Sequence, residues 1–155
     1  MADSECGNSP SIPSRRVAVC RSPLLYIIED NDDNLLLYEW IFTRHLRTIT
    51  FHLFSDGTFL RSRLEAARQK PDLILLDLKM PYISGLELLV QLKQDPHWKD
   101  IPVIIYTHST SEREREACFQ AGASGFIHKE ISVHGIRAQL EDVCQVWLKA
   151  NRFTV

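Results

Sequence analysis

The chain has 155 residues, of which 45% are hydrophobic and 25% are charged, and its formal net charge at pH 7 is −2. This length is enough for one domain with a sizeable core and too short for two ordinary domains. The charge balance lacks the basic excess of a dedicated nucleic-acid-binding protein, and no apolar run approaches the roughly 18 residues of a membrane span. We therefore expect a soluble protein with no direct nucleic-acid partner and no membrane partner.

The sequence predicts a flexible N-terminal tail over residues 1–23, because Ser, Pro and Arg occur there without a hydrophobic period. The polar start MADSECGNSP also lacks the basic segment and apolar stretch of a secretory signal, which favours a cytoplasmic location. The four cysteines form no C-x-x-C pair and are expected to be reduced thiols. We expect the folded domain over residues 24–149, followed by a C-terminal extension over residues 150–155.

Five short apolar runs alternate along the chain with longer mixed segments, and each run has the length of a strand. They cover residues 24–28, 49–53, 73–76, 103–106 and 125–128. The strongest runs are apolar almost throughout, as strands covered on both faces are, and each is followed by a segment long enough for a crossover helix. The sequence therefore predicts an α/β fold, with a parallel sheet and helices on both of its faces.

The helix expected after the first strand has two readable faces. Its core side is predicted to carry Leu37, Tyr38, Ile41 and His45. Leu36 and Trp40 fall on the opposite side, one turn apart, where the helix should meet solvent. Isolated apolar residues are normal on a surface, but this pair also fits a contact with a partner or with a second copy of the chain, and both readings stay open.

Other helix features carry structural information. The last helix is predicted to have a core stripe of Ile136, Leu140, Val143 and Trp147. The fourth helix, SEREREACFQA, has many charged residues and a weak apolar side, so it should be the least firmly packed. Gly122 follows it and suits the left-handed conformation of a helix end. Asp32 and Asp33 are expected to cap the first helix and to favour its dipole.

Polar residues stand where the predicted strands end. Glu29 and Asp30 end the first strand, Asp77 the third and Thr107 the fourth, and Lys129 follows the fifth. Because ligands of open parallel sheets bind at the carboxyl ends of the strands, these side chains should converge if the strands are neighbours. Three carboxylates that close would raise one another's pKa unless a cation lies among them, and Mg²⁺ suits such oxygen ligands.

These residues, with two longer motifs, resemble the receiver domain of bacterial response regulators. That family has an acidic pair after the first strand, an aspartate ending the third, a Thr or Ser ending the fourth and a lysine after the fifth. The segments D-L-K-M-P-x-x-S-G, starting at Asp77, and A-G-A-S-G-F-I-x-K, ending at Lys129, strengthen the match. The resemblance covers about residues 24–149 and implies a flavodoxin-like three-layer (βα)5 sandwich with strand order 2-1-3-4-5.

The resemblance also implies a role for each acid. Asp77 would accept a phosphoryl group from a phosphohistidine of a sensor histidine kinase or a histidine phosphotransfer protein. Glu29 and Asp30 would hold Mg²⁺, directly or through water, together with Asp77 and the backbone carbonyl of Lys79. Phosphoryl transfer needs positioning and charge neutralisation more than covalent chemistry, and such a site supplies both.

Two further residues would contact the phosphoryl oxygens, Thr107 by hydrogen bonding and Lys129 through its charge. In the family, phosphorylation moves this Thr and an aromatic residue three positions before the lysine, here Phe126. The phosphoryl group adds charge and acceptor oxygens, so it would draw the Thr107 hydroxyl inward and free space for the ring. The fourth helix, with the fifth strand and helix, would then form the output surface.

Two positions depart from the family pattern. Glu130 stands where the family usually has a proline, often preceded by a cis peptide bond. A cis bond before a non-proline residue costs about 2.5 to 4 kcal/mol, so this bond is either trans with a shifted loop or cis and strained. His108 stands where many members have a small residue beside the phosphorylated aspartate. Its ring either hinders water and lengthens the phosphorylated state or turns to solvent.

The leading interpretation is a stand-alone response regulator of a two-component or phosphorelay system, not an enzyme beyond promoting its own phosphorylation and dephosphorylation. The alternative is a degenerate receiver that binds partners without phosphorylation, although all five site residues are present. A phosphohydrolase with an aspartyl nucleophile would want a second acid two residues after the first, where Lys79 stands. The sequence leaves open the kinase, the stimulus, the target and whether the protein forms a homodimer.

Overall fold

The computed structural model describes residues 21–148, which form five strands and five helices in alternation. The elements are β1 (Leu24–Ile28), α1 (Asp32–His45), β2 (Thr50–Phe54), α2 (Leu60–Ala66), β3 (Leu73–Leu76), α3 (Gly85–Gln94), β4 (Val103–Thr107), α4 (Glu112–Gln120), β5 (Gly125–His128) and α5 (Val133–Trp147). All five predicted strands form; β2 is shifted by one residue and β4 is one residue longer. Most of the predicted tail and all of the predicted extension lie outside the described residues. No helix among residues 21–148 is long and apolar enough to cross a membrane.

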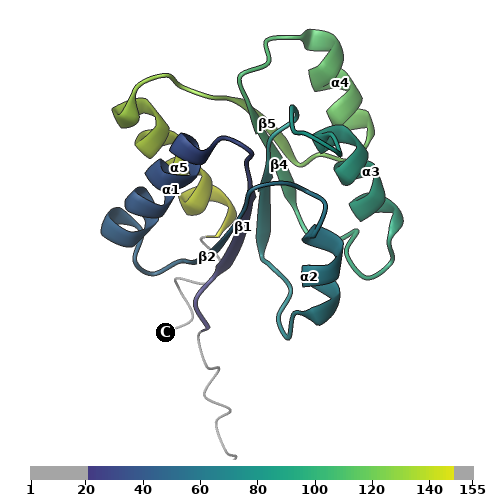
Figure 1. Ribbon diagram of the computed structural model, residues 1–155, viewed down its shortest axis with the longest axis horizontal. Helices are drawn as coiled ribbons and strands as arrows, with labels where there is room; N and C mark the ends of the chain where they lie inside the picture. The colour runs from purple at the N-terminus through teal and green to yellow at the C-terminus, as the bar shows by residue number, and fades with distance from the viewer. Residues whose placement is uncertain (1–20, 149–155) are drawn as a thin grey trace, which may run out of the picture.

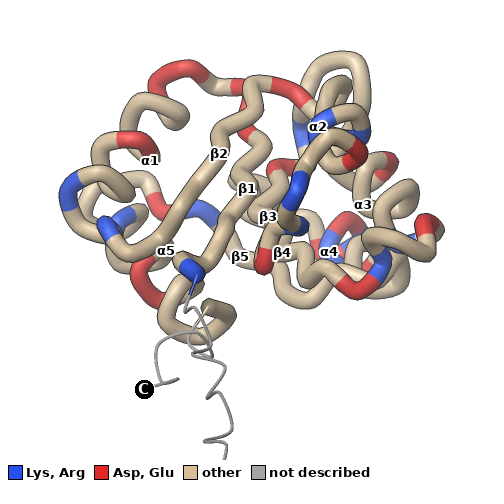
Figure 2. Tube along the Cα trace, turned by 90° about the horizontal axis from the view of Figure 1, so that it is seen from below, with Lys and Arg blue, Asp and Glu red and all other residues tan. Residues whose placement is uncertain are grey.

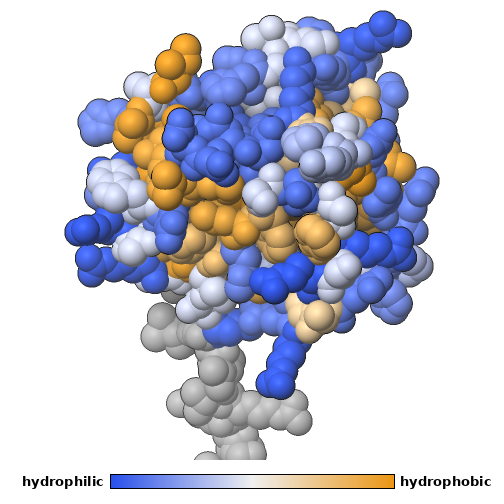
Figure 3. Space-filling model, in the orientation of Figure 1, coloured by the Kyte–Doolittle hydropathy of each residue, from blue (hydrophilic) through white to orange (hydrophobic). Residues whose placement is uncertain are grey.

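The strands form one parallel sheet in the order β2-β1-β3-β4-β5, which confirms the expected topology. Helices α1 and α5 cover one face of the sheet, and α2, α3 and α4 cover the other (Figures 1 and 2). Figure 1 views the sheet from its β2 edge, and Figure 3 shows hydrophobic residues in the middle of this view, between α1 and α2. The three-layer sandwich is therefore confirmed.

Two hydrophobic clusters fill the spaces on either side of the sheet. Alternate residues of β1 join different clusters, so that Leu25 and Ile27 pack with α1 and α5, whereas Tyr26 and Ile28 pack with α2 and α3. Every residue of β1, β3 and β4 is buried, which explains their almost uninterrupted apolar sequences. Full burial of one large apolar side chain contributes roughly 1.5–3 kcal/mol, so these strands hold their carboxyl ends firmly in place.

Two helix residues predicted in the core are at the surface. His45 ends α1 and is exposed, and Trp147 ends α5 and is 38% exposed. In each helix the next residue, Leu46 or Leu148, is buried instead. Both leucines have non-helical backbone angles as the C-cap, so the 100° spacing that predicted the core face no longer applies there.

Helix α4 is packed as weakly as its sequence predicts. Cys118 is its only buried residue, and acidic and basic residues occur along its length (Figure 2). Gly122 follows the helix with a φ of 104°, which confirms the expected left-handed conformation. Among the helices of the described chain, α4 has the fewest buried residues to restrain it.

The cap of α1 differs from the prediction. The capping hydrogen bond comes from Asn31, whose side-chain oxygen accepts from the backbone N–H of Asn34 at 3.0 Å. Asp32 and Asp33 lie in the first turn, where their negative charge favours the helix dipole. The prediction that their charge favours the helix dipole agrees with the structure. The prediction that they cap the helix is wrong, because Asn31, just before them, supplies the capping acceptor.

Candidate functional site

The carboxyl ends of four neighbouring strands, in the order β1-β3-β4-β5, meet at one edge of the sheet. The predicted acceptor, metal-binding and phosphoryl-contacting residues all lie there. A pocket of about 300 Å³ is lined by Glu29, Asp30, Asp77, Lys79, Thr107, His108 and Lys129, among others. The strand order thus joins residues that are far apart in the sequence.

Three carboxylates in this pocket fit a divalent cation. Glu29, Asp30 and Asp77 each offer one oxygen, and these oxygens lie within 4.8 Å of one another. Glu29 and Asp77 are buried, while Asp30 is exposed. Mg²⁺ prefers oxygen ligands and keeps several waters, which the open side of the pocket can supply. The residues therefore suit the predicted ion.

The ammonium group of Lys129 neutralises part of this negative charge. Lys129 is 2% exposed, and its Nζ lies 2.9 Å from Oδ2 of Asp77. The same Nζ forms a second ion pair with Oε2 of Glu29 and lies 5.5 Å from the centre of the Tyr106 ring. A buried ammonium needs such partners, because its desolvation is otherwise very unfavourable. Lys129 is therefore fixed beside the predicted acceptor.

Glu29 is far more buried than an ordinary glutamate, at 2% exposed. Burial raises its pKa, the hydrogen bond and charge of Lys129 oppose this rise, and the charge of Asp77 adds to it. The Tyr38 hydroxyl donates to Oε2 of Glu29 at 3.3 Å, and the backbone N–H of Asn31 donates to Oε1 at 3.3 Å. Burial also raises the pKa of Tyr38, which stays a donor at neutral pH.

A short chain of hydrogen bonds links the site to α4. Thr107 is buried, and its Oγ1 accepts from the backbone N–H of Ser109 at 3.2 Å. The Ser109 hydroxyl bonds to the carboxylate of Glu114 on α4, and its Oγ accepts from the N–H of Ser111 at 3.2 Å. The sequence did not predict Ser109 or Glu114 as site residues, because hydrophobic periodicity does not set the partners of a loop serine.

The peptide bond between Lys129 and Glu130 is trans. Oε1 of Gln139, on α5, accepts from the Glu130 N–H at 3.0 Å and from the Tyr106 hydroxyl at 2.7 Å. Nε2 of Gln139 donates to the His128 carbonyl at 2.7 Å. A proline at position 130 would lack the N–H that bonds Gln139. The sequence did not predict Gln139, since one polar residue beside a core stripe gives no signal of its own.

The loop after Asp77 depends on Gly85, which begins α3. A Cβ atom at this position would lie 2.0 Å from the carbonyl oxygen of Asp77, so only glycine fits. The Gly85 N–H donates to the Leu78 carbonyl at 2.9 Å. Ser84 and Glu87 form a capping box at the same helix start. These contacts explain the S-G pair of the motif and fix the backbone beside the predicted acceptor.

The remaining predicted residues lie around the site or away from it. Phe126 is half-buried and packs on the cluster shared with α2, α3 and α4. His108 has an exposed side chain, and its carbonyl oxygen lies 3.1 Å from Nε2 of His128. Leu36 and Trp40, on α1, are 65% and 47% exposed, which confirms their expected solvent-facing side. The switching, access and contact roles of these residues stay predictions.

The sequence matches the response regulator receiver domain family over residues 25–141. The chain belongs to this family. Receiver domains are phosphoaccepting signalling domains of two-component systems, and the sheet order found here is that of the receiver fold. The match covers the five strands except Leu24, the first residue of β1, and it ends within α5.

Curated relatives and solved structures agree with this assignment. DivK of Brucella ovis, a polar-differentiation response regulator, is 38% identical over 69% of this chain and 84% of its own length. The phosphorylated cyanobacterial phytochrome response regulator RcpA is 25% identical, with a TM-score of 0.77 over 83% of this chain and 95% of RcpA. Some relatives are longer, and this chain spans 44% of the KDP operon regulatory protein KdpE of Escherichia coli, which is 36% identical over 63% of this chain.

One solved receiver bears on the metal. The receiver domain of a sensor histidine kinase from Pseudomonas aeruginosa is 25% identical, with a TM-score of 0.66 over 83% of this chain and 98% of that domain. It was solved with a magnesium ion coordinated in the active-site cleft. In the present receiver domain, the acidic cluster of Glu29, Asp30 and Asp77 has a donor set that suits the same ion.

Proposed function

We propose that this receiver domain is a response regulator that accepts a phosphoryl group on Asp77 from a phosphohistidine of a sensor histidine kinase or a histidine phosphotransfer protein. The observation that carries the proposal is the buried contact of 2.9 Å between Asp77 and Lys129, next to two further acids. Asp77 is 8% exposed and opens onto the pocket, so a donor has access to its carboxylate from one side.

The proposed reaction forms a bond between a carboxylate oxygen of Asp77 and phosphorus, and it breaks the P–N bond to the donor histidine. The electron pair of the P–N bond goes to the ring nitrogen. Because the other ring nitrogen carries a proton, the histidine departs as a neutral imidazole. Negative charge is spread over the phosphoryl oxygens during transfer. The Lys129 ammonium and the Thr107 hydroxyl would stabilise this charge from fixed positions.

Glu29, Asp30 and Asp77 would hold Mg²⁺, with the backbone carbonyl of Lys79 as a further ligand. The bound ion would supply positive charge beside the transferring phosphoryl group. Glu29 contributes a carboxylate that is already oriented by Tyr38 and Lys129. Because these neighbours hold the glutamate before an ion binds, little rearrangement is needed to form the site.

Phosphorylation of Asp77 is further proposed to alter the surface formed by α4, β5 and α5. A Thr107 hydroxyl drawn to the phosphoryl group would change its contact with Ser109, which is bonded to Glu114 on α4. Displacement of α4 would disturb few apolar contacts, because this helix buries only Cys118. Phe126 packs on the same side of the sheet, where it would fill space that Thr107 leaves.

Intact-mass spectrometry tests the phosphoacceptor. The full chain, incubated with acetyl phosphate and Mg²⁺, should gain the mass of one phosphoryl group, and Asp77→Asn should gain none. Asp100→Asn, which changes an exposed acid outside the pocket, is the matched control and should behave as wild type. An equal gain by Asp77→Asn would overturn the assignment. No gain by wild type, with acetyl phosphate or a kinase, would favour an interaction module that works without phosphorylation.

We also propose that Leu36 and Trp40 contribute to a contact with the partner or with a second copy of the chain. Both are large apolar side chains, and they lie one turn apart on the exposed side of α1.

We also propose that the protein works in the cytoplasm, because the partner kinase would take its phosphoryl group from ATP.

A further inference from the structure

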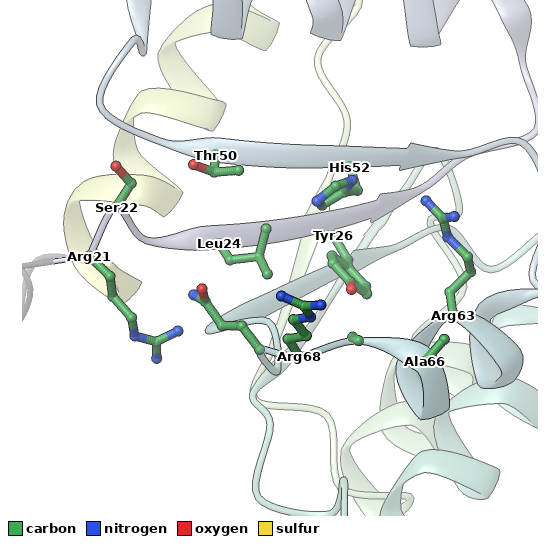
Figure 4. Close-up of a pocket in the computed structure, with 11 residues that line it drawn as sticks. Arg21, Ser22, Leu24, Tyr26, Thr50, His52, Arg63, Ala66 and Arg68 are labelled. Carbon is green, nitrogen blue, oxygen red and sulfur yellow. The ribbon is translucent and has the colours of Figure 1, made fainter.

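A second and larger pocket lies at the opposite end of β1 and β2 from the acidic site. It has a volume of about 540 Å³ and lies between the first half of these two strands and the end of α2 (Figure 4). Arg21, Arg63 and Arg68 line it, together with Tyr26 and His52. None of its lining residues is acidic. We call it the arginine pocket.

The positive charge of the arginine pocket is largely uncompensated. Arg21 forms an ion pair with Asp72, with 3.0 Å between Nη2 and Oδ1. Arg63 and Arg68 have no carboxylate partner among residues 21–148. Arg63 lies over the Phe54 ring, 6.0 Å from its centre, which leaves its N–H groups available. Arg63 and Arg68 are both exposed, and each offers a guanidinium group without an ion pair on the α2 side of the pocket.

Tyr26 adds a hydrogen-bonding group to the arginine pocket. This residue is 4% exposed, and its hydroxyl has no hydrogen-bond partner within residues 21–148. Figure 4 shows the hydroxyl directed away from β1, toward the segment that follows α2 and carries Arg68. No buried side-chain N or O atom among the described residues lacks a partner, so this hydroxyl is accessible from the open pocket, where a ligand could accept its hydrogen bond. Burial raises the pKa of Tyr26 while the charge of Arg63 opposes the rise, so the group remains a donor at neutral pH.

We propose that the arginine pocket binds a small organic phosphate. Guanidinium groups match the geometry of phosphate oxygens, and the Tyr26 hydroxyl would donate a further hydrogen bond. A volume of about 540 Å³ exceeds what one phosphate group fills and lies within the usual size of small-molecule sites. Leu24, Ala66 and the His52 ring line the rest of the pocket and would contact the organic part.

The binding test uses the full chain and isothermal titration with AMP, glucose 6-phosphate and inorganic phosphate. At least one of the two organic phosphates should bind saturably and more tightly than inorganic phosphate. Arg63→Gln and Arg68→Gln should each weaken this binding about tenfold, as expected for loss of a charged hydrogen bond. Arg61→Gln is the matched control, because Arg61 is on the same helix, pairs with Glu65 and does not line the pocket.

Two further measurements make the outcome decisive. Amide chemical-shift changes on ligand addition should centre on Tyr26, His52 and the end of α2, and Tyr26→Phe should weaken binding while keeping the ring. No saturable organic phosphate, binding equal to that of inorganic phosphate, or equal binding by an Arg63→Gln/Arg68→Gln double variant would overturn the proposal. Acetyl phosphate labelling of Asp77 should be unchanged in these variants, so failure here is distinct from failure at the acidic site.

Discussion

Lys129 is the counter-charge on which the acidic site depends in the absence of metal. Replacing it with alanine would leave the buried carboxylates of Glu29 and Asp77 without an ammonium partner. The free energy of unfolding of Lys129→Ala, measured with urea in the presence of EDTA, should therefore fall by about 3 kcal/mol. Added Mg²⁺ should recover part of this loss, because the ion binds the folded state through the same acids.

Lys99→Ala is the control for this measurement, since Lys99 is an exposed lysine outside the pocket. Its free energy of unfolding should change by less than about 0.5 kcal/mol, with or without Mg²⁺. A Lys129→Ala protein as stable as wild type without the metal would contradict the electrostatic account of the site.

Glu29 should make Mg²⁺ binding depend on pH. Burial raises the pKa of Glu29, so protons compete with the ion at a higher pH than they would at a surface glutamate. Mg²⁺ affinity should fall as pH falls through this raised pKa, and binding should release protons in that range. Calorimetry in two buffers of different ionisation enthalpy measures the release. Glu29→Gln should bind Mg²⁺ more weakly and lose this proton release. If the variant still releases protons on Mg²⁺ binding, the protons come from a group other than Glu29.

The same pKa affects stability in the opposite direction. A raised pKa means that the folded protein holds the Glu29 proton more tightly than the unfolded chain does. Without Mg²⁺, ionisation of Glu29 therefore lowers stability as pH rises through the interval between the unfolded and folded pKa values. This loss is relieved when the pH falls again, and Glu29→Gln should not show it.

At the scale of elements, Gln139 holds α5 to the ends of β4 and β5. Gln139→Leu would remove three hydrogen bonds, to Glu130, Tyr106 and His128. We expect stability to fall by about 1–3 kcal/mol, because the Tyr106 hydroxyl loses its partner in a part-buried place. Labelling of Asp77 by acetyl phosphate should also slow, since Lys129 lies in the loosened segment. Mg²⁺ affinity should stay nearly unchanged, because the three acids follow β1 and β3, away from Gln139.

Gln145→Leu is the matched control for this prediction, as Gln145 is an exposed residue of the same helix. It should change neither the labelling rate nor Mg²⁺ affinity. If Gln139→Leu lowered stability but left the labelling rate at the wild-type value, Gln139 would have only a structural role.

Helix α4 should open more readily than α5. One residue of α4 is buried, whereas α5 buries Ile136, Leu140, Val143 and Cys144. Fewer buried contacts mean a smaller free energy of local opening, so the amide hydrogens of α4 should exchange faster. Hydrogen exchange followed by mass spectrometry compares the two helices in one sample. Equal protection would show that α4 is restrained by contacts other than burial.

At the scale of the whole molecule, the exposed side of α1 bears on self-association. Trp40→Glu places a charge beside Leu36, so any dimer that uses this surface should dissociate. Light scattering with and without beryllofluoride would measure the mass of both forms. Glu39→Gln, at a neighbouring exposed position of the same helix, is the control. A dimer that persists in Trp40→Glu would show that this surface is not the dimer interface. If the wild-type protein is monomeric in both forms, the surface would instead contact a different protein.

Much of this molecule could be predicted from its sequence, for identifiable reasons. Uninterrupted apolar runs such as that of β3 indicate strands buried on both faces, and the polar residues that end them, such as Asp77, lie at the functional edge. Ser109 and Gln139 could not be predicted, because their partners depend on how distant segments pack. His45 and Trp147 were misplaced because helical spacing was extended to the helix ends. The arginine pocket depends on where α2 ends relative to β1, which periodicity does not determine.

The two pockets have side chains of opposite charge at opposite ends of β1, which the formal net charge of −2 does not reveal. Carboxylates gather at the carboxyl ends of the strands, and the guanidinium groups of Arg21, Arg63 and Arg68 lie at the other end of β1 and β2. An approaching protein with a positive surface would rotate this molecule so that the acidic end faces it. Such an orienting torque acts before contact and weakens as salt screens it over about 10 Å at 0.1 M.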